Sequence, residues 1–144
     1  KQIKERVEKE LTKDLGKRPQ IVIDPTVFNF GKVSKAQGKI SHVFKVRNKG
    51  NSDLVINNIS PACPCTVASI KIDNYKSPIF NTSGASKDWQ IKLPPGKMAE
   101  LKVILDLNHE SMRGSGNISR IVLILSNDPL YPSISAMVAV EMQN

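Results

Sequence analysis

Beyond Pro19 the sequence consists of short stretches in which apolar and polar residues alternate, and this two-residue period is the feature that most restricts its fold. One face of the strand expected at 39–48 carries Ile40, His42, Phe44 and Val46. Further strands are expected at 20–24, 27–31, 53–59, 66–72, 98–107, 118–125 and 134–142. Turn residues separate these stretches at a spacing typical of an all-β, immunoglobulin-like β-sandwich of seven to nine strands. Because no helix stands between strands, a parallel nucleotide-binding sheet is excluded.

Two other segments define the domain organisation. Apolar residues recur every four positions over 1–16, which predicts a short helix. This spacing drifts around a 3.6-residue helix and makes no coiled-coil seam, so the helix is expected to pack or to act as a tether. We therefore divide the chain into an N-terminal helix or tether at 1–18 and a β-sandwich domain at 19–144. Within that domain, the polar segment 73–90 is expected to be an inserted loop or small hairpin.

The strand expected at 118–125 differs from the others because it is apolar on both faces. That pattern is expected of a central strand.

Of the net charge of +8, residues 1–18 supply +3, and the remaining +5 is concentrated in a basic stretch without acidic residues between Pro25 and Ser52. Its bases are Lys32, Lys35, Lys39, Lys45, Arg47 and Lys49. Such a face can attract phosphate, nucleic acid or an anionic membrane surface. Aromatic residues make up only 5% of the chain and are not interleaved with these bases, so no nucleic-acid ligand is expected. A solvated face is the leading interpretation, with Lys45 and Arg47 kept as candidates for contact with a protein.

Both cysteines fall in one motif, Cys63-Pro64-Cys65-Thr66, which follows the strand expected at 53–59. A disulfide across one residue needs its two Cα atoms within about 4.4–6.8 Å. Pro64 disfavours α geometry at Cys63, and an extended backbone puts the two side chains near or beyond that limit. A disulfide would therefore be strained, although an oxidising compartment would still allow it. With no cation or helix N-terminus expected nearby to lower a thiol pKa, plain structural thiols are the leading interpretation.

A soft metal ion such as Cu(I) is an alternative ligand for Cys63 and Cys65. His42 would have to approach from a neighbouring strand, with the thioether of Met98 or Met112 as an additional ligand. Structural zinc and blue copper each need further ligands at spacings that the sequence lacks. We therefore expect no cofactor or resident metal, and we interpret His42 as a packed core or interface residue.

The sequence assigns no catalytic residue. His109 is expected in a solvated loop, far in strand register from His42, and no Gly-x-Ser-x-Gly elbow is present. An enzyme is therefore not expected.

Several motifs follow one another in a characteristic order. They are Phe28-Asn29-Phe30-Gly31, His42-Val43-Phe44, Asn48-Lys49-Gly50, Cys63-Pro64-Cys65-Thr66, Pro95-Gly96 and Ser126-Asn127-Asp128-Pro129. Together they resemble a bacterial immunoglobulin-like domain of unknown function with a Cys-Gly-Cys-Thr signature, similar in fold to Hydin and major-sperm-protein-like domains. The resemblance covers about residues 19–142, with Pro64 in place of the usual glycine. Its turn chemistry suggests a backbone kink at Gly31 and a positive-φ turn at Asn48 and Gly50.

This resemblance implies an exported protein of the bacterial periplasm or cell surface, often a lipoprotein or a module of a larger surface protein. An anchor to the membrane upstream of residue 1 would fit that class. We therefore expect a non-enzymatic structural or protein-interaction module of the cell envelope with a protein partner. The identity of the partner and the oligomeric state stay open. The alternative is a thiol-based copper carrier or redox protein that uses Cys63 and Cys65.

Binding would use an edge or a face of a sheet, and a pilus-chaperone-like domain that accepts a partner's strand is one version of this. Loops often carry recognition residues, so Tyr75 and Trp89 of segment 73–90 are the remaining interaction candidates. Trp89 either folds onto the sandwich or stays exposed for a partner.

Overall fold

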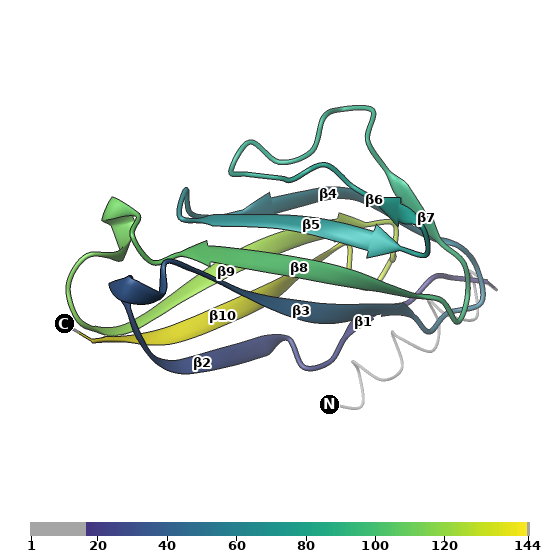
Figure 1. Cartoon of the computed structure of the whole chain (residues 1–144). Helices are drawn as coiled ribbons and strands as arrows, with labels where there is room; N and C mark the ends of the chain where they lie inside the picture. The colour runs from purple at the N-terminus through teal and green to yellow at the C-terminus, as the bar shows by residue number, and fades with distance from the viewer. Residues whose placement is uncertain (1–16, 144) are drawn as a thin grey trace.

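The structure, a computed structural model, describes residues 17–143, so the helix expected at 1–16 lies outside the described residues. Within that part of the chain, ten strands form two five-stranded sheets that pack face to face, which confirms the immunoglobulin-like β-sandwich (Figure 1). Sheet A contains, in spatial order, β1 (Ile21–Ile23), β3 (Lys39–Asn48), β8 (Met98–Asp106), β5 (Thr66–Ile72) and β6 (Tyr75–Lys76). Sheet B contains, in spatial order, β2 (Val27–Ser34), β10 (Ser133–Gln143), β9 (Gly116–Ser126), β4 (Leu54–Pro61) and β7 (Ile91–Leu93).

Strands β6 and β7 have no counterpart among the stretches expected from the sequence. They contain two and three residues, which is too short to show an alternating pattern. Two single-turn 3-10 helices, η1 (Lys35–Gln37) and η2 (Glu110–Met112), also lie between strands. The eight longer stretches are all strands, and most observed bounds differ from the expected ones by a few residues.

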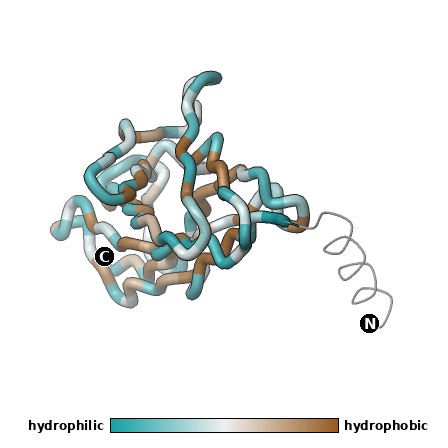
Figure 2. Tube along the Cα trace, turned by 90° about the vertical axis from the view of Figure 1, so that its right-hand side faces the viewer, coloured by the Kyte–Doolittle hydropathy of each residue, from teal (hydrophilic) through white to brown (hydrophobic). Residues whose placement is uncertain are grey.

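The core forms where the alternating apolar residues of the two sheets meet. Strand β10 shows the pattern clearly, because Ala136, Val138, Val140 and Met142 are buried and the residues between them are not. Polar residues concentrate in the connections between strands. The connection between β6 and β7 rises above the sandwich (Figure 1), and its tip is hydrophilic (Figure 2).

Strand β9 lies between β10 and β4, so its central position is confirmed. Its inward residues Val122 and Ile124 are buried, but Ile121 and Leu123 on the outward side are 41% and 37% exposed. Burial on both faces therefore does not explain why this strand is apolar on both faces.

Segment 73–90 begins as a hairpin and continues as a loop that leads to sheet B. Strand β6 pairs with the end of β5, and the backbones of Phe80 and Ala68 exchange two hydrogen bonds of 2.7 and 3.0 Å. Phe80 is buried, and the Trp89 ring packs edge-on against it with ring centroids 4.7 Å apart. The segment therefore contributes aromatic side chains to the core.

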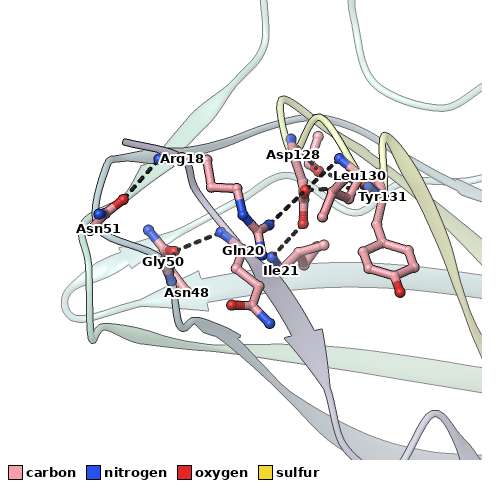
Figure 3. A network of polar contacts seen from close by, with 10 residues as sticks. Arg18, Gln20, Ile21, Asn48, Gly50, Asn51, Asp128, Leu130 and Tyr131 are labelled. Carbon is pink, nitrogen blue, oxygen red and sulfur yellow. Dashed lines mark hydrogen bonds and ion pairs between the residues drawn. The ribbon is translucent and has the colours of Figure 1, made fainter. Parts of the chain in front are cut away.

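The turn after β3 is organised by Asn48, which is fully buried (Figure 3). Its Oδ1 accepts hydrogen bonds from the backbone N–H groups of Gly50 and Gln20, and its Nδ2 donates to two carbonyls. Asn48 does not have the positive φ expected from the sequence, and neither does Gly50. Gly50 is needed because the backbone of residues 18–20 lies directly against it, where a Cβ would collide with the carbonyl oxygen of Arg18. The kink expected at Gly31 is present, with φ of 79°.

Candidate thiol site

The cysteine motif forms a tight turn, and the extended backbone expected from the sequence is wrong. The Thr66 N–H donates a 3.0 Å hydrogen bond to the Cys63 carbonyl, with Pro64 at the second position of the turn, where its fixed φ fits. This turn brings the two cysteine sulfurs to 2.8 Å, and both cysteines are free thiols. Cys63 is partly exposed, whereas Cys65 is 2% exposed. The site is therefore a compact dithiol with one accessible sulfur.

A cation lies beside the dithiol, contrary to the expectation from the sequence. Arg120 Nε donates a hydrogen bond of 3.2 Å to the sulfur of Cys65, which lies 55 positions away in the chain. The other guanidinium nitrogens donate to the carbonyls of Ser119 and Ser111 at 2.9 and 3.0 Å. These three contacts hold the guanidinium in place, and its positive charge favours an ionised sulfur.

The contact between Arg120 and Cys65 could not be predicted from the sequence, because it depends on strand register. It lies on the inward side of β9 in the same alternation as Val122 and Ile124. A single arginine in that apolar alternation is the only local signal that the sequence offers.

On its other side, the dithiol contacts Ser111, which in turn contacts His109. The sequence alone predicts that His109 is merely solvated. The Ser111 hydroxyl lies 3.3 Å from the Cys63 sulfur and 2.9 Å from His109 Nδ1. That ring nitrogen also accepts the backbone N–H of Ser111 at 3.0 Å, so it is an acceptor. The hydroxyl proton of Ser111 can therefore point either to His109 or to the Cys63 sulfur.

These contacts change the acidity of Cys63. Burial raises the pKa of Cys63. Hydrogen bonds from the Cys65 thiol, the Ser111 hydroxyl and the Cys65 backbone N–H lower this pKa, as does the charge of Arg120, and together they outweigh the effect of burial. The net effect lowers the pKa of the Cys63 thiol to about 7. A large fraction of Cys63 is thus a thiolate at neutral pH, which is the nucleophilic form.

Among the described residues, His42 does not join the two cysteines as a third ligand for copper. His42 stacks on Phe28 with ring centroids 3.7 Å apart, and burial lowers its pKa. Met98 lies opposite Arg47 at one end of β8, and Met112 is fully buried in η2. Among residues 17–143, no group of three His, Cys, Asp or Glu side chains is placed to hold a metal ion.

Tyr75 and Trp89, the contact residues expected in segment 73–90, are hydrogen-bonded to each other. Trp89 Nε1 donates a 3.0 Å hydrogen bond to the Tyr75 hydroxyl, and the Trp89 ring packs against the core. Of the two roles open to Trp89, the structure shows the one in which it folds onto the sandwich. Tyr75 itself stays exposed.

Lys45 and Arg47 are exposed on the outward side of sheet A. Although their stretch of sequence has no acidic residue, strand β8 places Glu100 opposite Lys45 and Asp106 opposite Lys39. The outward side of sheet A is therefore a face of mixed charge.

The outward side of sheet B carries a row of apolar side chains that crosses three strands. We call Val27, Met137, Ile121 and Leu123 the outer apolar row. Val27 and Ile121 lie on either side of Met137 in register, and the neighbours of Leu123 across the strands are Ser135 and Ser60. Val27, Ile121 and Leu123 are exposed and Met137 is partly exposed.

Comparison with known proteins supports an immunoglobulin-like domain of unknown function. The family described as "protein of unknown function (DUF1573)" matches residues 21–79. No curated protein matches the chain. The Cys-Gly-Cys-Thr signature and the likeness to Hydin and major-sperm-protein-like domains stay predictions. In residues 17–143 the structure contains no helix with the length and apolarity needed to cross a membrane.

Solved structures share the fold at low sequence identity. A protein of unknown function from Porphyromonas gingivalis W83 is 17% identical with a TM-score of 0.61, and the match covers 87% of this chain and 46% of that protein. The ASH/PapD-like domain 7 of human CEP192 is 12% identical with a TM-score of 0.53, covering 88% and 87% of the two chains. A family 123 glycoside hydrolase from Clostridium perfringens is 12% identical with a TM-score of 0.56, covering 88% of this chain and 27% of that enzyme. This chain thus spans less than half the length of the Porphyromonas protein.

Proposed function

We propose that this chain is a non-enzymatic protein-interaction module of the bacterial cell envelope, in the periplasm or at the cell surface. The observation that carries the proposal is the outer apolar row, in which Ile121 and Leu123 are exposed at the centre of a sheet. Neighbouring apolar residues at the surface mark sites of protein contact more often than scattered ones do. The cellular location rests on the resemblance to exported bacterial domains.

A sheet face suits binding better than a sheet edge in this domain. Three of the four edge strands, β1, β6 and β7, have only two or three residues. The fourth, β2, is kinked at Gly31, and its register with β10 shifts at the same place. Short and irregular edges discourage the addition of a further strand. A role in accepting a partner's strand is therefore less suited to this geometry than binding through the outward face of sheet B.

The partner that fits this face is a different protein with a neutral, largely apolar contact surface. The residues next to Leu123 across the strands are serines, so the centre of the face carries no charge to be matched. A second copy of the chain is a poorer fit, since each copy carries a net charge of +8 and the two would repel. Proteins similar in fold also support a modular role, because the Porphyromonas match occupies 46% of that protein.

Photocrosslinking in the envelope fraction of the source bacterium tests the proposal. A crosslinkable amino acid at Ser135, next to Leu123, should capture one defined protein. The double variant Ile121→Ser/Leu123→Ser should lose at least about nine-tenths of that product, because it removes the apolar contact. The matched control is Val43→Ser, which removes an apolar side chain of 41% exposure from the outward face of sheet A. It should leave the product unchanged.

Three results would count against the proposal. Equal capture by the double variant and by Val43→Ser would show that the outer apolar row does not bind. A crosslink between two copies, together with a dimer in light scattering, would replace the hetero-partner by self-association. Absence of any product from a folded, exported chain would remove the interaction role.

A further inference from the structure

We propose that Cys63 and Cys65 form a reversible dithiol–disulfide pair that reduces low-molecular-weight organic disulfides, with Cys63 as the attacking sulfur and Cys65 as the resolving sulfur. This reaction goes beyond the protein-interaction role and does not depend on the outer apolar row.

Accessibility decides which sulfur attacks. Cys63 is partly exposed, whereas Cys65 is buried, so a disulfide from solvent meets the Cys63 sulfur first. The Cys63 sulfur also receives a 3.4 Å hydrogen bond from the backbone N–H of Cys65 and lies within reach of the Ser111 hydroxyl. Both donors stabilise a negative charge on this sulfur, and the pKa of about 7 agrees with that geometry.

Cys65 is placed for the second step. Its sulfur lies 2.8 Å from that of Cys63, so intramolecular attack needs little movement of the turn. Arg120 Nε donates a 3.2 Å hydrogen bond to the Cys65 sulfur, so a positively charged donor lies beside the sulfur that attacks in this step. The two sulfurs thus have separate partners, with Ser111 beside the attacking one and Arg120 beside the resolving one.

The reaction balances with one disulfide as the oxidant. The Cys63 thiolate attacks one sulfur of the disulfide RSSR, the RS–SR bond breaks, and a mixed disulfide Cys63–S–SR and one RS⁻ result. The Cys65 thiolate then attacks the Cys63 sulfur, which forms the Cys63–Cys65 disulfide and releases the second RS⁻. The protons from the two protein thiols end on the two RSH products. Two electrons pass from the protein to the disulfide.

Oxidised glutathione is the probe for the test, used with the reduced full chain under native conditions. Aliquots are quenched with acid and their intact mass is measured. The wild-type chain should lose two hydrogen atoms, release two molecules of glutathione and accumulate little mixed disulfide. Cys65→Ser should stop at a stable glutathione adduct on Cys63, since no resolving thiol is present. Cys63→Ser should react on the order of tenfold more slowly or not at all, because Cys65 is buried.

Arg120→Gln tests the assignment of the resolving sulfur. Without the charge-assisted hydrogen bond, the mixed disulfide on Cys63 should resolve about tenfold more slowly and should become visible in the wild-type cysteine background. Arg113→Gln is the matched control, because it removes an arginine charge that pairs with Glu110 and does not touch either sulfur. If Arg120→Gln does not fold, as judged by circular dichroism, the Cys65→Ser and Cys63→Ser results still decide the proposal.

Specific results would overturn this inference. Accumulation of the glutathione adduct in the wild-type chain to the level seen in Cys65→Ser would show that Cys65 does not resolve. Equal reactivity of Cys63→Ser and Cys65→Ser would remove the division of roles. Failure of both thiols to react in the folded chain would make the pair structural.

Discussion

Asp128 accepts a hydrogen bond from the backbone N–H of Ile21 over 2.9 Å, although the two residues lie 107 positions apart in the chain (Figure 3). The carboxylate is fully buried, and its other oxygen accepts the backbone N–H groups of Leu130 and Tyr131 at 2.9 and 3.3 Å. Arg18 approaches the same oxygen with Nη1 at 3.7 Å. The Asp128 side chain therefore links β1 of sheet A to the turn between β9 and β10 of sheet B.

The first prediction concerns this carboxylate. Asp128→Asn places an NH₂ group where only acceptors fit, so at least one buried backbone N–H loses its partner. We expect the free energy of unfolding to fall by about 1–3 kcal/mol, measured by urea unfolding followed by circular dichroism. Asp53→Asn is the control, because Asp53 is exposed and only reaches Lys92 at 4.0 Å. It should change the free energy of unfolding by less than about 0.5 kcal/mol, and equal effects of the two substitutions would contradict the assigned role.

The second prediction concerns the close approach at Gly50. A Cβ there would collide with the backbone of residues 18–20, so Gly50→Ala must displace β1 from its neighbour. We expect a loss of about 1–3 kcal/mol in the free energy of unfolding, comparable to overpacking of a core. Ser52→Ala, in the same turn, should be nearly neutral. A gain in stability for Gly50→Ala, as seen where glycine is merely flexible, would show that the contact is absent.

The third prediction compares two adjacent residues of segment 73–90. Ile79 is 63% exposed, whereas Phe80 is 4% exposed and packs against Trp89. Ile79→Ser should therefore leave stability within about 0.5 kcal/mol, and Phe80→Ala should lower the free energy of unfolding by about 3–5 kcal/mol. Thermal and urea unfolding of both variants measure this difference. Similar results for the two variants would mean that the segment does not belong to the folded core.

The fourth prediction concerns the pH dependence of Cys63. Its thiol is protonated and slow below its pKa and becomes the reactive thiolate above it. The rate of alkylation by iodoacetamide, with Cys63 identified by peptide mapping, should thus rise with pH and reach half its maximum near pH 7. An unperturbed cysteine would reach that point at about pH 8.5.

Ser111→Ala should move this midpoint upward, because it removes a hydrogen bond that lowers the pKa of Cys63. Ser119→Ala is the control, since only its backbone carbonyl contacts Arg120. A midpoint at or above pH 8.5 in the wild-type chain would contradict the structure of the site.

Local sequence signals predict most of the fold. The strands expected at 39–48 and 66–72 have the same bounds as β3 and β5, because side-chain patterns and turn residues act within a few positions. The short strands β6 and β7 stay outside that prediction, since their pairing is decided by neighbours rather than by their own pattern. The outward exposure of Ile121 and Leu123 is likewise invisible in the sequence, which shows an apolar strand but not what covers it.

The candidate site divides in the same way. From the sequence alone, both thiols lie within one three-residue span next to a strand, and the chain folds as a β-sandwich, because both properties are local. Only the tertiary structure decides that the motif turns, that its sulfurs touch, and that Arg120 and Ser111 lie beside them. The contacts of Arg120 and Ser111 with the two sulfurs join residues some fifty positions apart, and they depend on how β9 and η2 align with the turn that precedes β5. Strand register across the sandwich therefore turns a pair of apparently structural cysteines into a charged and accessible thiol site.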